Sequence, residues 1–378
     1  MANKDFSRDI SSIESQLNSS HKKVIEHIYK NQRATRAEIA KFTGLSNQTL
    51  TRLTKQLISL NLISEHSKIS GMRGQPATYL RINEGVLATV GVVFEHDRVV
   101  VVAEDLNRRS IQRKVEQGHF QSAELAVSKA LEMLDNLFNE LDENFKVMGI
   151  GISVSGFFTN VSGRICSQQD PQGWAKIDFQ SVFARNYNLP CYVENDGNAA
   201  SIGFALSPEG ATLQSFFLIL FTLDIGGGFV FEGKIVDGAF GNAGEIAAIV
   251  NSGPNAIRPT IGSLTRYLES RWNESIEMEK VETRYIEGDT NIQSWLTACI
   301  ESLKFPLKAI QSLLDPEAII FTGRLPKTLQ QHLAENAVIT GPSYGDVYAP
   351  TPRIKVIDED EILERGVTAT PAFYFFNR

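Results

Sequence analysis

Residues 216–240, FFLILFTLDIGGGFVFEGKIVDGAF, read as an apolar strand, a glycine turn, a second strand, a short turn and a third strand. Residues 86–114, VLATVGVVFEHDRVVVVAEDLNRRSIQRK, have a similar order and predict a β-meander with a turn at EHDR. The amphipathic pattern of residues 122–141 and the apolar strand of residues 147–158 follow this earlier copy. Two such starts predict a duplicated α/β body with a cleft between two lobes, in which ligands bind beyond the strand ends.

The composition is that of a globular protein large enough for two or three domains. The 378 residues are 42% hydrophobic and 21% charged, and no apolar run approaches the roughly 20 residues of a membrane span. The first residues lack the apolar segment of a signal peptide, so we expect a cytoplasmic protein with no membrane partner. Cys166, Cys191 and Cys299 lie far apart and predict reduced thiols rather than disulfides.

The charge is distributed unevenly along the chain. Residues 1–85 hold thirteen Lys and Arg against seven Asp and Glu, although the whole chain has a net charge of −7. A basic head on an acidic body indicates that the head binds a polyanion and that the body does not.

The head has the pattern of a helix-turn-helix. Residues 21–32, HKKVIEHIYKNQ, place four large apolar side chains on one helical face. Thr35 with Glu38 three residues later is a capping-box pattern for a second helix, which we expect to end at Gly44. Ser46 is the predicted N-cap of a third helix, so a tight turn joins the last two helices.

The third helix is the predicted DNA-reading helix. Leucines at helical spacing form its packing stripe, and the other face is polar. That face carries Asn47, Gln48, Thr49, Thr51, Arg52 and Lys55, with Ser46 at its start. Amides, hydroxyls and basic groups read base edges and bind phosphates in a major groove. The alternative is the solvated face of a small protein-interaction bundle.

Residues 62–83 predict a hairpin after this helix, which completes a winged helix. The tip holds Arg73, Gly74, Gln75 and Pro76. Glycine allows a close approach to a neighbouring surface, and an Arg presented in this way suits a narrow minor groove. We therefore predict a double-stranded DNA operator as the partner, contacted by the third helix and by this tip.

Three further motifs carry a resemblance to a known family. They are ENDGNAA at residues 194–200, IGGGFVFEGKIVDGAFGNAGEI at residues 225–246, and LDPEAIIFTGRLP at residues 314–326. Together with the winged head, they make residues 20–378 similar to a transcriptional regulator of the ROK family (repressors, open reading frames and sugar kinases). The resemblance implies an actin-like, ribonuclease-H-type body that normally binds a sugar between its lobes.

The resemblance also implies the domain organisation. We expect the winged helix-turn-helix in residues 1–85, the first actin-like lobe in residues 86–200 and the second in residues 201–378. The C-terminal helix is expected to return to the first lobe.

Kinases of this family bind ATP phosphates through two glycine-rich loops. The resemblance places the first at GVVFEHDRV, residues 91–99, which has no glycine pair and carries the bulky Phe94 and the acidic Glu95. The second is TLDIGGG, with Thr222 and Asp224 where glycines are expected. A carboxylate repels phosphate unless Mg²⁺ intervenes. We therefore predict no kinase activity, no catalytic residue and no cofactor.

The resemblance implies a zinc site as well, formed by a His after GEI and three Cys in a C-x-C-G-x-x-G-C run. Those positions hold Ala248, Ala256, Arg258 and Ser263, and none is a good zinc ligand. We predict no metal, and a loop held by packing and hydrogen bonds. In the family the same His usually contacts a sugar hydroxyl, as does a Glu at the position of Thr265.

VENDGNAA, residues 193–200, stands where a strand ends and a helix begins. In the kinases, the residue that matches Asp196 is the base that deprotonates the sugar. Without a phosphate donor, its carboxylate would accept hydrogen bonds from a carbohydrate-like effector, beside Asn195 and facing Glu245 of the second lobe. The alternative is that Asp196 only caps the helix.

These patterns predict a DNA-binding transcriptional repressor that senses a sugar or sugar-derived effector. Regulators of this kind usually bind DNA as symmetric oligomers, so we expect a homodimer or homotetramer. The alternatives are a sugar kinase with a DNA-binding head and a DNA-binding protein that needs no effector.

Overall fold

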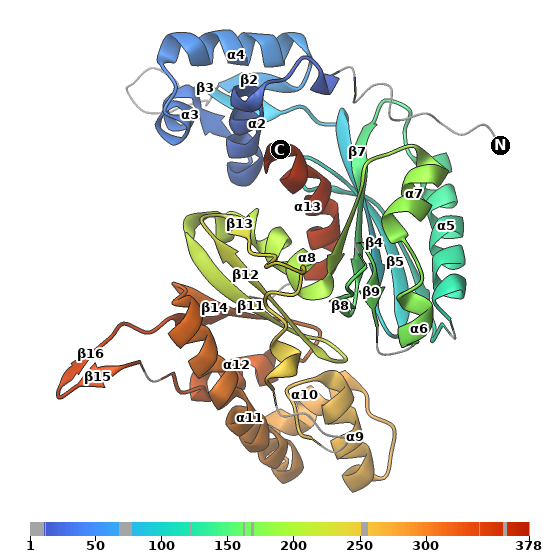
Figure 1. The fold of residues 1–378 in the computed structure, drawn as a ribbon, viewed down its shortest axis with the longest axis vertical. Coiled ribbons are helices and arrows are strands. Elements are labelled where there is room, and N and C mark those ends of the chain that lie inside the picture. Colours follow the sequence, from blue (N-terminus) through green and yellow to red (C-terminus); the bar gives the residue numbers. More distant parts are fainter. Residues whose placement is uncertain are drawn as a thin grey trace. The chain divides into compact units, whose positions relative to one another are not determined.

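The computed structural model describes residues 11, 13–67, 78–120, 122–161, 163–167, 170–250, 256–339, 341–357 and 361–377. The chain folds into two compact units (Figure 1). The first consists of Met1–Glu194, Leu206–Ala211 and Leu363–Arg378, and the second of Asn195–Ala205 and Thr212–Ile362. The C-terminal segment thus packs with the first unit, whereas Asn195–Ala205 packs with the second. The predicted domain limits at residues 85 and 200 stay predictions.

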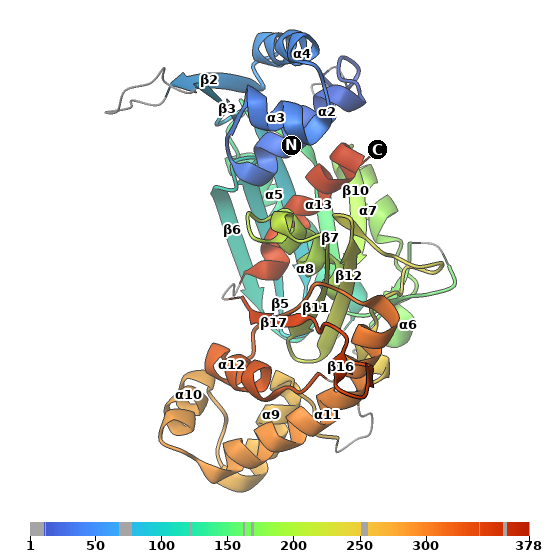
Figure 2. The same cartoon turned by 90° about the vertical axis from the view of Figure 1, so that its left-hand side faces the viewer.

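The N-terminal part of the first unit is a winged helix (Figure 2). Its elements are α2 (Ser19–Asn31), β1 (Ala34–Thr35), α3 (Arg36–Thr43), α4 (Asn47–Ser59), β2 (Ile63–Ser67) and β3 (Thr78–Ile82). The strands pair in the order β1-β3-β2, and β3 is antiparallel to both neighbours. The helices bury the following large apolar side chains: Val24, Ile25, Ile28, Ile39, Leu50, Leu53 and Leu57.

The helix boundaries of the head follow from local capping, as predicted. The Thr35 hydroxyl accepts a hydrogen bond from the Glu38 backbone N–H at 3.2 Å, and Glu38 Oε2 accepts one from the Thr35 N–H at 2.7 Å. Ser46 Oγ accepts from the Thr49 N–H at 3.2 Å and so caps α4. Gly44 closes α3 with a left-handed φ of 70°, which explains a glycine at this turn.

The remainder of the first unit is built on a five-stranded sheet in the order β10-β7-β4-β5-β6. The strands are β4 (Leu87–Phe94), β5 (Arg98–Asp105), β6 (Ser110–Gln117), β7 (Lys146–Val154) and β10 (Cys191–Asn195). Strands β4, β5 and β6 form an antiparallel meander, and β7 runs parallel to β4. A small ribbon joins β8 (Phe157–Phe158) and β9 (Ile165–Cys166).

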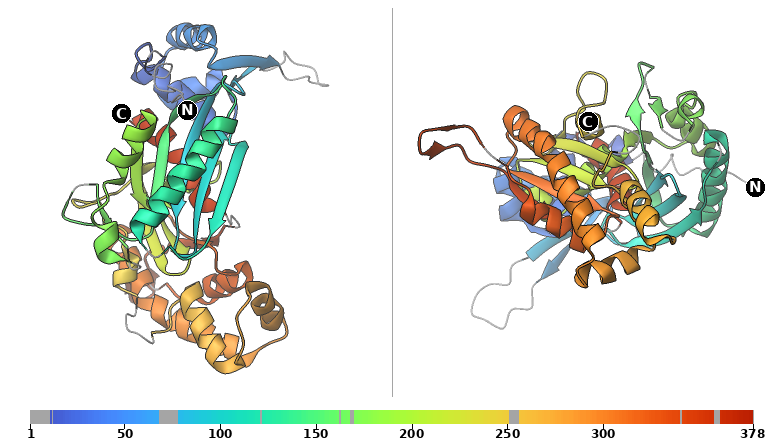
Figure 3. Two further views of the ribbon diagram at one scale, coloured as in Figure 1. Left: turned by 90° about the vertical axis from the view of Figure 1, so that its right-hand side faces the viewer. Right: turned by 90° about the horizontal axis from the view of Figure 1, so that it is seen from below.

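Helices cover both faces of this sheet. One face packs against α5 (Ala123–Glu140), α6 (Pro171–Trp174) and α7 (Phe179–Tyr187), as Figure 3 shows for α5. The other face carries α13 (Ile362–Asn377). A Cβ on Gly151 of β7 would lie 2.0 Å from the Val367 carbonyl oxygen of α13. The absence of a side chain at Gly151 therefore allows helix and sheet to approach closely.

The second unit repeats the same sheet. Its order is β13-β12-β11-β14-β17, with an antiparallel meander over the first three strands and parallel pairing of β11, β14 and β17. The strands are β11 (Ser215–Phe221), β12 (Ile225–Phe231), β13 (Lys234–Ile235), β14 (Ala318–Gly323) and β17 (Arg353–Val356). Both sheets have the same strand order and combine an antiparallel meander with a parallel strand next to it, which confirms the predicted duplication.

The helices of the second unit also divide between two faces. Helix α8 (Asp196–Ala205) packs on one face, and the other face shares a core with the remaining helices. Those helices are α9 (Ile261–Trp272), α10 (Met278–Ile286), α11 (Thr290–Leu314) and α12 (Lys327–Asn336). Short elements complete the unit: η1 (Gly210–Thr212), η2 (Ile246–Ala248) and the hairpin of β15 (Ser343–Tyr344) and β16 (Val347–Tyr348). Within the described residues, none of the helices is both long and apolar enough to cross a membrane.

The prediction of a glycine turn in residues 216–240 is wrong in one respect. Gly226, Gly227 and Gly228 lie inside β12, and the turn before them is formed by residues 222–224. A Cβ on Gly228 would lie 2.7 Å from the carbonyl oxygen of Gly197 in α8. The glycine run therefore lets the first turn of α8 lie directly on the strand.

Candidate DNA-binding helix and effector site

Helix α4 presents the predicted DNA-reading side chains to solvent. Its leucines face the core, which leaves the opposite face exposed. Ser46, Asn47, Gln48, Thr51, Arg52 and Lys55 are exposed, and Thr49 is half-buried. Two of the hydroxyls are used locally, because Ser46 caps the helix and Thr51 donates to the Asn47 carbonyl oxygen at 2.8 Å. The side chains best placed to reach a partner are therefore the two amides and the two basic groups.

The other half of the predicted DNA interface is the tip of the wing. Arg73, Gly74 and Gln75 lie outside the described residues. The strands that lead to the tip are present and paired, from Ile63 opposite Ile82 to Ser67 opposite Thr78. The tip contacts stay a prediction.

Asn195 organises the predicted effector site. It is the last residue of β10, and α8 follows it directly. Its Oδ1 accepts a hydrogen bond from the Asn198 backbone N–H at 2.7 Å, which is the geometry of a helix N-cap. Its Nδ2 donates to Glu245 Oε1 at 2.8 Å. One buried amide thus fixes the start of α8 and joins it to a carboxylate fifty residues later.

Asp196 occupies the first position of α8 and is half-buried. Its Oδ1 accepts from the backbone N–H of the next residue, Gly197, at 2.9 Å. The capping bond three residues ahead comes from Asn195 instead, a role that sequence reasoning considered only for Asp196. The Asp196 carboxylate also lies close to Gly226, where a Cβ would be 3.0 Å from Oδ1. Glycine at that position leaves room for the carboxylate.

Glu245 completes the cluster. Burial, with the Asp196 carboxylate nearby, raises the pKa of Glu245 from 4.5 to about 7, although the hydrogen bond from Asn195 acts in the opposite direction. Near neutral pH, Glu245 therefore exists in both forms and is able to donate as well as accept a hydrogen bond. Asn195, Asp196 and Glu245 all belong to the second compact unit, rather than to two different lobes as the sequence suggested.

The loop at the position of the family's zinc site is held by hydrogen bonds. The Arg258 guanidinium pairs with Asp224, with 3.3 Å between Nη1 and Oδ1. Ser263 Oγ accepts from the Arg258 backbone N–H at 3.1 Å and from Trp295 Nε1 at 3.3 Å. Two residues at predicted zinc-ligand positions thus make ordinary polar contacts. Within the described part of the chain, no group of three His, Cys, Asp or Glu is placed to hold a metal ion.

The first altered loop of the kinase comparison also has internal partners. Glu95 is buried after β4 and forms an ion pair with Arg98. The Phe94 ring packs against Trp174 and Phe179, with ring centroids 5.5 and 5.6 Å apart. The turn is thereby filled by side chains.

An exposed polar helix in a winged head, on a body of two repeated sheets, defines a DNA-binding module joined to an actin-like body. The ROK family model matches residues 96–338, and a winged helix-turn-helix DNA-binding model matches residues 17–64. The chain belongs to the ROK family.

Relatives of known sequence include both regulators and kinases. The chain is 29% identical to the uncharacterised protein y4fQ of Sinorhizobium fredii, over 89% of this chain and 86% of that protein. It is 23% identical to the xylose repressor of Caldicellulosiruptor bescii, over 59% of this chain and 56% of the repressor. It is 24% identical to the beta-glucoside kinase of Listeria monocytogenes, over 63% of this chain and 79% of the kinase. The chain thus spans little more than half the length of that xylose repressor.

The fold is also that of a solved regulator. A ROK family transcriptional regulator, described as a homologue of the E. coli MLC protein, superposes with a TM-score of 0.66 at 16% identity. The match covers 95% of this chain and 98% of that chain.

Proposed function

We propose that the chain is a cytoplasmic transcriptional repressor that binds a double-stranded DNA operator through α4 and the wing. The observation that carries the proposal is the polar face of α4, where Asn47, Gln48, Arg52 and Lys55 are exposed. These groups have the chemistry of major-groove and phosphate recognition. The similarity to xylose repressors supports the sense of regulation, and a symmetric oligomer would match two half-sites.

We propose further that a sugar or sugar-derived effector binds at Asn195, Asp196 and Glu245. The cluster offers a carboxylate acceptor, an amide, and a second carboxyl that carries a proton part of the time near neutral pH. Such a mixture of donors and acceptors suits a polyhydroxylated ligand. The effector alters DNA affinity only if it binds the two functional states with different affinity.

The two altered loops favour a regulator without kinase activity over a sugar kinase. Glu95 is paired with Arg98, and Asp224 is paired with Arg258. At both expected phosphate positions the arginine is therefore already bound to a carboxylate of the protein. Backbone amides of a glycine loop would be needed there to approach phosphate.

A series of side-chain contacts within the first unit links Glu194 to the winged head. Glu194, directly before Asn195, accepts a hydrogen bond from the Tyr374 hydroxyl of α13. The next residues of α13 contact the head. Lys22 Nζ lies 4.4 Å from the centroid of the Phe375 ring, and the ring centroids of Phe376 and Tyr29 are 5.6 Å apart. We propose that α13 transmits a change at Asn195 to α2 and so to α4.

The test is the substitution Asp196→Asn, which keeps the size of the side chain and removes its charge. Operator affinity without sugar should stay within about twofold, whereas the response to an effective sugar from a monosaccharide panel should fall by about tenfold or more. DNA binding is measured by fluorescence anisotropy and sugar binding by calorimetry. Loss of DNA binding without sugar, together with intact sugar binding, would make Asp196 structural and defeat the effector-site proposal.

A further inference from the structure

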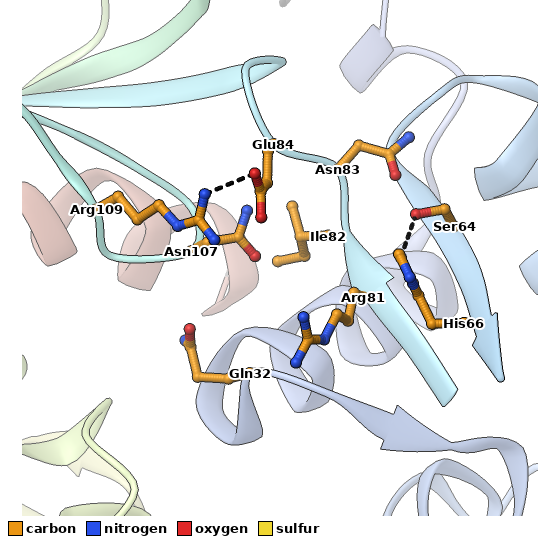
Figure 4. A pocket seen from close by; sticks show the side chains of 9 residues that line it. All are labelled: Gln32, Ser64, His66, Arg81, Ile82, Asn83, Glu84, Asn107 and Arg109. Carbon is orange, nitrogen blue, oxygen red and sulfur yellow. Dashed lines mark hydrogen bonds and ion pairs between the residues drawn. The ribbon is translucent and has the colours of Figure 1, made fainter. Parts of the chain in front are cut away.

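A polar pocket lies where the winged head meets the sheet of the first unit (Figure 4). Its volume is about 250 Å³. Three parts of the chain supply its walls: the head, the segment after β3, and the turn between β5 and β6. The lining residues are Gln32, Ser64, His66, Arg81, Ile82, Asn83, Glu84, Asn107 and Arg109. All but Ile82 are polar or charged, so the pocket suits a hydrophilic occupant.

The pocket carries a net positive charge. Arg81 and Arg109 both line it, and Glu84 is the single acid among the lining residues. Glu84 Oε2 pairs with Arg109 Nη1 at 2.6 Å, as Figure 4 shows. No ion pair of Arg81 occurs among the residues that the structure describes, and its guanidinium extends from β3 toward Gln32 in Figure 4. An anion in the pocket would therefore meet a guanidinium whose charge is not already neutralised.

The turn between β5 and β6 brings Asn107 and Arg109 to one wall of the pocket. The backbone of this turn is fixed, because Asp105 Oδ1 accepts from the N–H groups of Asn107 and Arg109 at 2.8 and 2.9 Å. The turn that carries Asn107 and Arg109 is therefore ordered at the edge of the pocket.

The other walls are held in place before any ligand arrives. Asn83 Nδ2 donates to the Asn61 carbonyl oxygen at 2.9 Å, and Gln32 Nε2 donates to the Tyr29 carbonyl oxygen at 2.9 Å. Ser64 Oγ and His66 Nε2 lie 3.0 Å apart in a hydrogen bond. A pocket whose side chains are ordered in advance loses less conformational entropy on binding.

We propose that this pocket binds a small anionic metabolite with a phosphate or carboxylate group, held by Arg81. The site is separate from the cluster at Asn195, Asp196 and Glu245, and it does not depend on that cluster binding a sugar. Because its walls come from both the head and the adjoining sheet, a bound anion ties the head to the rest of the first unit.

The experiment titrates three probes into the full chain by calorimetry: inorganic phosphate, citrate and glucose 6-phosphate. At least one probe should bind saturably with one site per chain. Arg81→Gln and Asn107→Asp should each weaken that binding by about tenfold or more, because one removes the cation and the other places a negative charge beside the anion. Comparing the three probes distinguishes a phosphate from a carboxylate ligand.

Two controls make the result decisive. Arg185→Gln removes an exposed guanidinium of α7 in the same unit and should leave the affinity unchanged. Asp196→Asn should also leave it unchanged, since the two sites are separate. Saturable binding of none of the probes overturns the proposal. Binding that is unchanged in Arg81→Gln and Asn107→Asp also overturns the proposal. Binding that Arg185→Gln weakens equally does the same, because in both cases the probe is an adventitious ion only.

Discussion

At the scale of single residues, Asn195 shows how one side chain serves local structure and the site together. Its oxygen caps α8, and its nitrogen binds Glu245. Asp196 therefore does not need to cap the helix. Its carboxylate lies near Glu245 and helps to raise the pKa of Glu245. The proposed effector site is thus a coupled group, in which changing one member alters the protonation of another.

The pKa of Glu245 leads to a pH-dependent stability. Because its pKa in the folded protein is raised from 4.5 to about 7, the folded protein binds more protons than the unfolded chain between these values. This group therefore makes the free energy of unfolding decrease as the pH rises through that window. Glu245→Gln should remove this component, which amounts to at most roughly 3 kcal/mol.

The measurement is urea unfolding of wild type and variant at several pH values from 4.5 to 8. Glu269→Gln, which removes an exposed carboxylate of α9, is the control and should follow the wild type. Parallel stability curves for wild type and Glu245→Gln would show that Glu245 titrates normally.

At the scale of elements, α4 and α13 have different tasks. Helix α4 is stabilised by its N-cap and by its buried leucines, and its opposite face is exposed to solvent. Helix α13 is packed on β4 and β7 at its start and reaches the head with its last aromatic residues. The first element is suited to binding and the second to coupling.

Arg52 of α4 is expected to bind a DNA phosphate. Arg52→Gln should weaken binding to specific and unrelated DNA alike, and the slope of log K against log salt should fall in magnitude by about one. Titrations at several salt concentrations measure both effects, with Arg185→Gln as the charge-matched control. An unchanged slope together with lost discrimination would instead assign Arg52 to base contact.

Tyr374 of α13 is expected to couple the effector site to the head. Tyr374→Phe removes its hydrogen bond to Glu194 and keeps the ring that stacks on Tyr192 at 4.9 Å. Sugar binding and sugar-free operator affinity should each change by less than about threefold, while the effect of sugar on operator affinity should fall by several-fold, since coupling energies are typically 1–3 kcal/mol. Equilibrium binding with both ligands measures the coupling.

Tyr187→Phe in α7 is the matched control for Tyr374→Phe. It also removes a tyrosine hydroxyl, which donates to the Leu131 carbonyl oxygen at 3.1 Å on another part of the first unit. Its coupling should equal that of the wild type. If both variants lose coupling equally, general loosening of the first unit explains the effect and α13 has no special role.

At the scale of the whole molecule, the body combines a duplicated fold with loops that the sequence resemblance places at the family's phosphate and zinc positions. Arg258 binds Asp224, and Ser263 accepts from Trp295, at positions where zinc ligands are expected. Glu95 binds Arg98 at an expected phosphate loop. Side-chain contacts thus occupy the positions at which the sequence resemblance places the phosphate and the zinc ion.

The purified protein should therefore hold no stoichiometric zinc, and a chelator should leave its melting temperature unchanged. It should release no ADP from ATP with any sugar of a panel. Elemental analysis, thermal unfolding with and without chelator, and a coupled ADP assay test these points. One zinc per chain would contradict the contacts assigned to the Arg258 loop, and sugar-dependent ADP release would contradict the regulator reading of the body.

The sequence by itself determined the local and periodic features. Thr35, Glu38 and Ser46 predicted helix starts, because a cap acts within three or four residues. Alternating and continuous apolar runs predicted both meanders, because side-chain direction follows the backbone repeat. The polar face of α4 followed from helical spacing alone.

Only the tertiary structure decided which distant residues meet. The bond from Asn195 to Glu245 spans fifty residues, and that from Tyr374 to Glu194 spans 180. The raised pKa of Glu245 depends on burial and on a carboxylate from another element. The glycines of β12 likewise resemble a turn until α8 is seen to lie on them. Such contacts arise from packing between elements, and a local sequence pattern specifies the elements but not their neighbours.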